Sequence, residues 1–193
     1  RSLYFVLCLS SFFLGAVNSA REIVKERDIF LRERMFDLSS VAYVGSKVLV
    51  LGMVGGVQCA ALVAIVAASI PLKVDIFLLT GVLFVVSLSG TSVGLFISAC
   101  SKSDDRAVMM VPLIVIPQIL FSDFVLGDSK LENWTGTLQR LMPVHWGYKV
   151  LAGAVSGDLA WNTTVSAVAV LVVGAYAAYR LTVIRLENTS YVA

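Results

Sequence analysis

Charged side chains are scarce in this sequence. Asp, Glu, Lys and Arg make up only 15% of its 193 residues, whereas a soluble domain carries about 25%. Hydrophobic residues make up 58% and gather in five runs, at about 3–20, 43–70, 75–100, 106–127 and 159–182. A helix needs roughly 20 apolar residues to cross the hydrocarbon core of a membrane. We therefore expect an all-α, polytopic transmembrane bundle of about five spanning helices.

Side chains that perform catalysis or bind cofactors are also few. The single histidine, His145, has no thiol or carboxylate cluster near it, so we expect an interfacial polar residue there. The adjacent Asp104 and Asp105 are expected to cap a helix that begins at Ala107. No stretch matches the phosphate-binding pattern G-x-x-x-x-G-K-S/T, and no basic patch with interleaved aromatics indicates a nucleic-acid partner. We expect no catalytic residue, cofactor site or metal site in this chain.

Basic residues are distributed unevenly between the two sides of the expected bundle. Ten of them lie in residues 21–40, at Lys47, in the short connection 101–106 or in the C-terminal tail, and four lie in the alternate connections. Loops on the cytoplasmic side of a membrane carry an excess of Lys and Arg. The first loop and the C-terminus are therefore predicted to be cytoplasmic, and residues 128–158 to form an external loop.

Two features of the apolar runs indicate how the helices pack. Gly52 with Gly56, and Gly90 with Gly94, are spaced so that the backbones of two helices can approach closely. The partner of each pair could be another helix of the same chain or a second copy.

The run at 106–127 contains two prolines, Pro112 and Pro117, and each removes a backbone donor and should kink the helix. Gln118 follows directly. A kinked helix with a polar residue at membrane depth usually faces protein or a water-filled cavity. We therefore name Asn18, Pro117 and Gln118 as candidates for lining a substrate path, with simple packing as the alternative.

The external loop is expected to hold two short helices that dip into or lie on the outer leaflet. Leu131, Trp134, Leu138 and Leu141 recur at the period of an amphipathic helix, which Pro143 should end. A second apolar stretch follows, with its members at Trp146, Tyr148 and Leu151.

Residues 21–40 carry the densest charge in the chain, with five basic and five acidic side chains. An apolar set, Val24, Leu31, Met35 and Leu38, is spaced by seven, four and three residues. This pattern predicts an amphipathic helix over 21–38 that lies on the membrane surface with these four residues as its apolar face. It could be a solvated connector, or a docking helix that transmits force from a partner ATPase.

Three stretches of the sequence resemble a known transporter family. Lys25-Glu26-Arg27, Phe30 and Arg32-Glu33-Arg34 resemble the first intracellular loop of ABC-2 or ABCG-type (white-family) exporters. Residues 117–122 are similar to the outer end of the family's fifth span, and residues 141–148 to its last external loop. The resemblance extends from the second to the sixth span, so residues 1–193 are identified as part of a single ABC-2 type transmembrane domain.

The resemblance implies the permease part of an ATP-driven exporter. In that family two six-helix membrane domains flank a substrate path, and two nucleotide-binding ATPase domains, which hold ATP and Mg, drive them. The expected partners are therefore an ATPase domain, a second membrane domain (as a homodimer or heterodimer) and the lipid bilayer. The residues implied in coupling to the ATPase domain are Glu22, Lys25, Glu26, Arg27, Phe30, Arg32, Glu33 and Arg34.

The chain also departs from the family pattern. It enters an apolar segment directly after Arg1, so we expect the first span and the ATPase domain to lie outside it. It lacks the external-loop cysteines of many animal members, which favours a bacterial version in the inner membrane. The alternative function is an ion-coupled secondary transporter or channel subunit. Such proteins place ionisable residues inside spans, where only Lys47 and Asp123 come close.

Overall fold

All regular structure that the computed structural model describes is helical, as expected. The described residues are 2–36, 38–72, 74–122, 139–157 and 161–189. The helices are α1 (Ser2–Ala20), α2 (Glu22–Lys25), α3 (Arg27–Arg34), α4 (Ser40–Ser69), α5 (Ile76–Cys100), α6 (Asp104–Leu120), α9 (Pro143–Ser156) and α10 (Trp161–Thr189).

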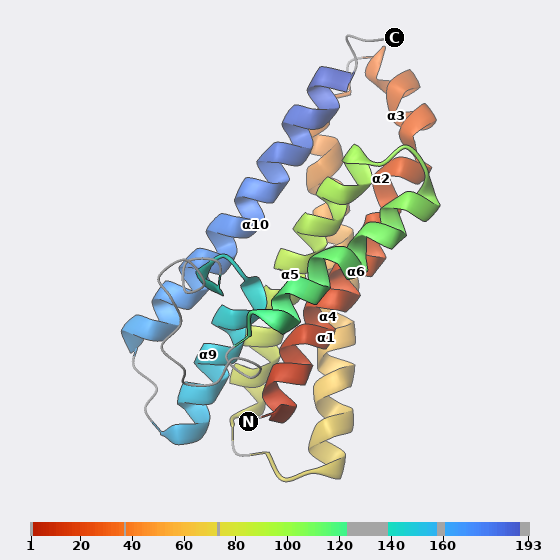
Figure 1. Cartoon of the computed structure of the whole chain (residues 1–193). Coiled ribbons are helices and arrows are strands. Elements are labelled where there is room, and N and C mark those ends of the chain that lie inside the picture. The colour runs from red at the N-terminus through yellow and green to blue at the C-terminus, as the bar shows by residue number, and fades with distance from the viewer. Residues whose placement is uncertain (1, 37, 73, 123–138, 158–160, 190–193) are drawn as a thin grey trace.

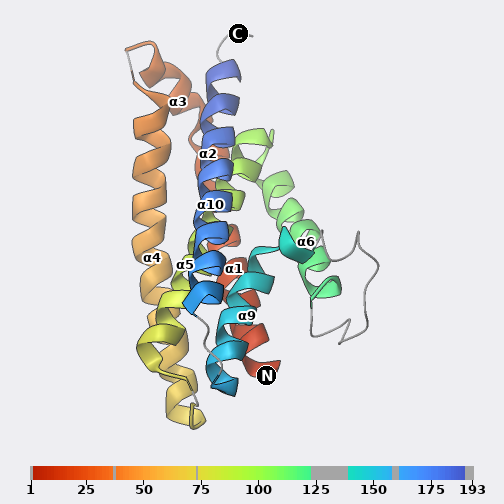
Figure 2. The same cartoon turned by 90° about the vertical axis from the view of Figure 1, so that its left-hand side faces the viewer.

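The long helices form a bundle in which α5 is central. It packs against α1, α4 and α10 (Figure 1). The N-terminus lies at one end of the bundle, whereas α2, α3 and the last turns of α10 lie at the other, which we call the α3 end (Figures 1 and 2). α4 and α6 lie on opposite sides of the bundle (Figure 2).

Four helical segments of the described chain are long and apolar enough to cross a membrane: Ser2–Lys25, Ser40–Ser69, Ile76–Cys100 and Trp161–Asn188. They correspond to four of the five expected spans. The other expected span, 106–127, contains α6, whose 17 residues rise about 26 Å, less than the roughly 30 Å of a hydrocarbon core. Residues 123–127 lie outside the described residues.

The starts of the helices follow local capping chemistry. The Ser39 hydroxyl accepts a hydrogen bond of 3.1 Å from the N–H of Ala42 at the start of α4, and the Asp75 carboxylate accepts one of 3.1 Å from Phe77 at the start of α5. The sequence predicted that Asp104 and Asp105 cap a helix beginning at Ala107, but the helix begins earlier. α6 begins at Asp104, so Asp104 and Asp105 lie inside its first turn, where the helix dipole favours their charge.

The closest packing in the bundle is between α1 and α5, and glycine permits it. A Cβ atom at Gly90 would overlap the carbonyl oxygen of Phe12, and one at Gly94 would overlap that of Ala16. The Gly90–Gly94 pair therefore packs against a helix of the same chain. At Gly52 a Cβ would lie 3.1 Å from the side chain of Leu88 on α5.

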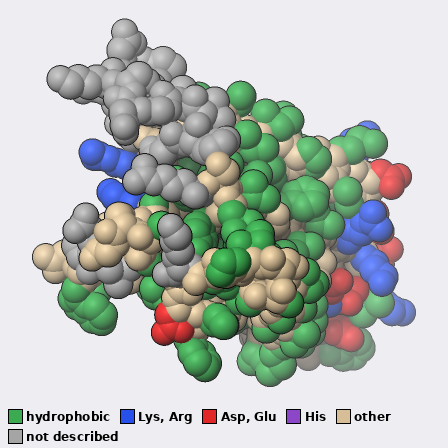
Figure 3. All heavy atoms as spheres, turned by 90° about the horizontal axis from the view of Figure 1, so that it is seen from below, with side chains coloured by type: hydrophobic (Ala, Val, Ile, Leu, Met, Phe, Trp, Pro, Cys, Tyr) green, Lys and Arg blue, Asp and Glu red, His purple; other side chains and the backbone are tan. Residues whose placement is uncertain are grey.

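The outer surface of the bundle is apolar. Large hydrophobic side chains are exposed along α4 and α10, among them Leu49, Met53, Val57, Val172 and Val173. Seen from the end opposite α3, hydrophobic side chains are widespread on the described part of the surface, and most charged side chains lie toward its edges (Figure 3). Soluble monomers rarely expose apolar patches of more than a few hundred Å², so this surface suits contact with lipid.

The segment expected to be an external loop contains α9 within the described residues. Pro143 occupies the first turn of α9, where its missing N–H has no intrahelical role. Gly157 ends α9 with a φ of 77°, in the left-handed region that favours glycine. The other expected short helix, between Leu131 and Leu141, falls mostly outside the described residues.

Candidate functional site

The charged segment after α1 does not form the single amphipathic helix that its spacing predicted. It contains α2 and α3, which are separated at Glu26, and α3 ends at Arg34. The predicted apolar face was wrong at Met35, which is 84% exposed because it follows the end of α3. The buried residues are Ile23 and Phe30, which lie in an apolar cluster with Val44, Leu51, Leu95, Ala99, Val183 and Leu186.

A lysine from α4 ties the break between α2 and α3 to the bundle. Lys47 Nζ lies 3.0 Å from Oε2 of Glu22 and 2.7 Å from Oε1 of Glu26. The Tyr43 hydroxyl donates a hydrogen bond of 3.2 Å to Oε2 of Glu26. The hydrogen bond from Lys47 lowers the pKa of the Glu26 carboxyl below its ordinary value. Glu22 and Glu26, both expected to face a partner, therefore face α4.

Phe30 anchors α3 to the same stretch of α4. Its side chain is only 2% exposed, and its ring centroid lies 4.7 Å from that of Tyr43. Tilted aromatic pairs at such separations stabilise packing by about 0.5–1.5 kcal/mol. Phe30 is therefore buried inside the chain.

Two arginines of the segment bind carbonyl groups at the ends of other helices. Arg27 Nη1 donates to the carbonyl oxygen of Ser101, which caps α5, at 3.3 Å, and Arg34 Nη1 donates to that of Leu186, near the end of α10, at 2.7 Å. The last carbonyls of a helix lack intrahelical partners and carry partial negative charge, so a guanidinium group suits them.

The start of α2 is held by α5. The Ser98 hydroxyl accepts hydrogen bonds of 3.0 Å from the N–H groups of Ile23 and Val24, which lie in the first turn of α2. First-turn N–H groups have no intrahelical acceptor, so this serine satisfies two of them. The charged segment is thus attached to α4, α5 and α10.

Lys25, Arg32 and Glu33 differ from the other charged members of the segment. All three are exposed at the α3 end. None of the three forms an ion pair within the described parts of the chain. They are the expected coupling residues whose charges remain accessible.

Sequence reasoning missed the roles of Lys47, Tyr43 and Ser98. A signal for Lys47 was present in the sequence. A lysine near the end of a spanning helix is costly unless it is paired, and Glu22 and Glu26 are four residues apart and so share one helical face. No comparable signal marks Ser98, since α5 contains three other serines.

The three residues named for a substrate path do not come together. Asn18 is half-buried, and its Nδ2 donates a hydrogen bond of 2.8 Å to Oε1 of Gln58, which joins α1 to α4. Pro117 is half-buried and is absent from the described lining of a cavity between the helices. Gln118 is 3% exposed and lines that cavity.

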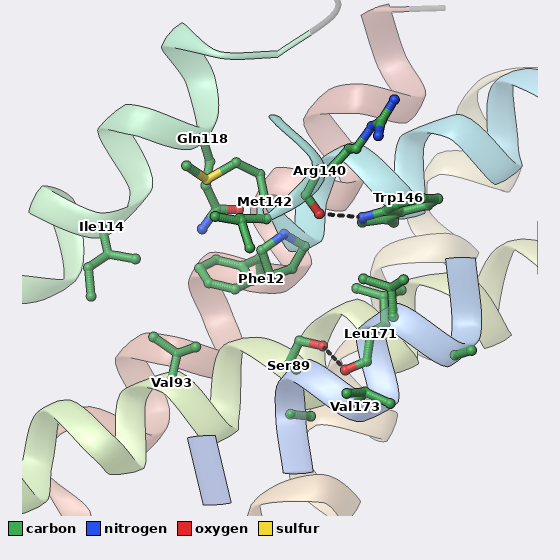
Figure 4. Close-up of a pocket in the computed structure, with 16 residues that line it drawn as sticks. Phe12, Ser89, Val93, Ile114, Gln118, Arg140, Met142, Trp146, Leu171 and Val173 are labelled. Carbon is green, nitrogen blue, oxygen red and sulfur yellow. Dashed lines mark hydrogen bonds between the residues drawn. The ribbon is translucent and has the colours of Figure 1, made fainter. Parts of the chain in front are cut away.

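The cavity has a volume of about 560 Å³ and lies between α1, α5, α6, α9 and α10. Figure 4 shows Gln118 extending from α6 toward Phe12 and Met142, with Trp146 and Leu171 on the other walls. Within the described residues, Oε1 of Gln118 accepts no hydrogen bond. The described lining of the cavity is therefore mostly apolar, and it includes one buried amide oxygen that accepts no hydrogen bond from the described residues.

No metal site is evident in the part of the chain that the structure describes, where no three His, Cys, Asp or Glu side chains are grouped. Cys8 and Cys59 are free and buried. The polar side chains of the charged segment hold helices together, and the amide of Gln118 can bind a ligand.

Comparisons with known proteins agree with this architecture. The family model for the ABC-2 type transporter matches residues 2–156. The chain is 28% identical over 162 residues to an ABC transporter ATP-binding/permease protein of Mycobacterium tuberculosis. That alignment covers 78% of this chain and 18% of the relative, so the chain spans less than a fifth of the relative's length.

Proposed function

Because this chain belongs to the ABC-2 type transporter family, we propose that it is the permease part of an ATP-driven exporter that docks to a nucleotide-binding ATPase domain. The family match and the relative both indicate a transporter permease in a membrane. The printed name of the relative, which includes both ATP binding and a permease, supports an ATPase partner that holds ATP and Mg. The family favours this function over an ion-coupled carrier or channel.

The observation that carries the proposal is the attachment of the charged segment to three helices at once. It is contacted by Lys47 on α4, by Ser98 on α5 and Ser101 at the C-terminal cap of that helix, and by Leu186 on α10. A displacement of α3 by a docked domain would therefore move the ends of three helices together. Transmission of this kind needs rigid contact and no local chemistry.

Docking itself would use the accessible charges Lys25, Arg32 and Glu33. Charged side chains at the edge of an interface steer association and set its register more than they add affinity. In the complete exporter the α3 end would face the cytoplasm of a bacterial cell, and the opposite end would face outward across the inner membrane. A second membrane domain would complete the substrate path, with Gln118 as the candidate polar residue of this chain.

Two variants of the complete transporter separate docking from transmission. The K25A/R32A/E33A variant removes the accessible charges and should weaken docking of the ATPase domain. ATP-dependent transport of dye into inside-out vesicles should therefore fall severalfold. K47M leaves those charges in place but removes the ion pair that holds Glu26, at the break between α2 and α3, against α4. It should keep ATP hydrolysis and lower the dye moved per ATP.

A matched control comes from the α5–α6 connection. K102A/D105A/R106A removes two basic side chains and one acidic side chain, all exposed and near the same end of the bundle. It should leave transport near the wild-type level. Unchanged transport in K25A/R32A/E33A, or an equal loss in the control, would contradict the docking role.

A further inference from the structure

We propose that the cavity beside Gln118 binds a neutral amphiphile, with an apolar body and one hydrogen-bond donor such as a hydroxyl or an amide N–H. Its volume of about 560 Å³ falls in the range of small-molecule sites, about 300–1,000 Å³. The walls come from helices of a single chain, α1, α5, α6, α9 and α10 (Figure 4). The inference concerns binding alone and does not rest on coupling to ATP hydrolysis.

The unpaired amide oxygen of Gln118 indicates a donor on the ligand. The side chain is only 3% exposed, and within the described residues its Oε1 accepts no hydrogen bond. A buried acceptor without a donor is destabilising, because it has lost its hydrogen bond to water. A ligand that donates to this oxygen would recover that free energy, whereas a purely apolar ligand would not.

Two other polar side chains on the wall donate hydrogen bonds to backbone carbonyl groups. The Ser89 hydroxyl donates to the carbonyl oxygen of Leu171 at 3.3 Å, and Nε1 of Trp146 donates to that of Arg140 at 2.7 Å (Figure 4). Gln118 is thus the side chain of the described lining that has a buried oxygen with no hydrogen-bond partner among the described residues. One donor, and not a polar headgroup with many, matches this wall.

The charge of the lining favours a neutral ligand. No acidic side chain is among the described lining residues. Arg140 is the basic member, but it is exposed, and Figure 4 shows its guanidinium group directed away from Gln118. A charged group brought beside Gln118 would lose its hydration without gaining a counter-ion, which is strongly unfavourable.

The depth of the cavity indicates that the ligand enters from the bilayer. Ser89 lies near the middle of α5, and Leu171 lies well inside α10. Both helices are long and apolar enough to span a membrane, so these residues lie within its hydrocarbon region. Phe12, Val93 and Ile114 supply apolar surface for the body of an amphiphile.

The test uses a dodecanol analogue that carries a diazirine, with its methyl ether as the matched probe without a donor. The complete transporter is held in phosphatidylcholine nanodiscs without ATP, irradiated, and mapped by mass spectrometry. A net hydrogen bond of about 0.5–1.5 kcal/mol corresponds to about a two- to twelvefold difference in affinity. The alcohol should label residues 169–175 more strongly than the ether by a factor in that range, and Q118M should remove the difference.

Two glycines give a matched pair of filling variants. A Cβ atom at Gly174 or at Gly81 meets nothing within 4 Å, but only Gly174 is in the described lining of the cavity. G174F should abolish labelling of residues 169–175, and G81F should leave it unchanged. In the wild-type protein, unlabelled dodecanol should compete with the probe, which tests the site without any substitution.

Several results would overturn the inference. Equal labelling by alcohol and ether would refute the donor, and labelling that persists in G174F, or that dodecanol does not reduce, would refute the cavity. Failure of the exporter proposal is recognised separately. In that case ATP-dependent transport is absent while the pattern of labelling remains.

Discussion

Replacement of Gly90 by alanine is expected to push α1 and α5 apart and to destabilise the bundle. The added Cβ would overlap the carbonyl oxygen of Phe12 and would lie 3.1 Å from its carbonyl carbon and 3.2 Å from its Cα. All three are backbone atoms, which cannot rotate away as the end of a side chain can. Relief of the overlap therefore requires a shift of one whole helix.

The magnitude follows from a comparison with Gly81, which lies in the same helix and has nothing within 4 Å of an added Cβ. Both substitutions gain about 1 kcal/mol of helix propensity, because alanine is the better helix former. That gain cancels in the comparison. What remains is the cost of overpacking, about 3 kcal/mol at the upper end of the usual range because backbone must move. G90A should thus be about 3 kcal/mol less stable than G81A.

The assay is unfolding of the purified protein by increasing SDS in mixed micelles, followed by circular dichroism. G81A should unfold at the same or a higher SDS fraction than the wild-type protein, and G90A at a clearly lower one. If G90A and G81A unfold together, the close approach of α1 and α5 is refuted. G94A provides a repeat, since its Cβ would overlap Ala16 on the next turn of α1.

Three further predictions concern polar contacts between helices. K47M should lower the free energy of unfolding by about 1–2 kcal/mol because it leaves two half-buried carboxylates unpaired, and a double-mutant cycle with E26Q in SDS unfolding should show strong non-additivity. The pKa of Glu26 is lowered in the folded protein. Its stabilising effect is therefore present above the ordinary carboxyl pKa and is lost as pH falls through the lowered value. The free energy of unfolding, measured from neutral to acid pH, should show this loss in the wild-type protein and less of it in E26Q. N18L should cost about 0.6–1 kcal/mol by leaving the amide oxygen of Gln58 without its donor, and adding Q58L should recover part of that loss rather than double it.

Much of the fold could be predicted from the sequence because hydropathy is a local property. Each of the four spans of the described chain coincides with an apolar run, since the membrane sorts residues by transfer free energy wherever their partners lie. The helix boundary at Pro143 could likewise be predicted from the local sequence, because a proline ends one helix and suits the first turn of the next.

The candidate site was predicted as a segment but not in its detail. The spacing of apolar residues between 21 and 38 named Met35 as buried, whereas Ile23 and Phe30 are the buried pair. Their neighbours include Leu95 and Val183, far away in the chain. Periodicity reports which residues share a helical face, but not which face the rest of the protein covers, nor that the helix breaks at Glu26.

The scarcity of charge and the order of the apolar runs determined that this protein is a helical membrane bundle, and they predicted that most of its basic residues lie at one end. Only the tertiary structure decided that Lys47 pairs with Glu22 and Glu26, that Asn18 is hydrogen-bonded to Gln58, and that the buried Oε1 of Gln118 accepts no hydrogen bond from the described residues. The physical reason is the distance along the chain over which each interaction acts. Solvation acts on each residue in its own sequence context, whereas ion pairs, hydrogen bonds and cavities depend on which helices meet.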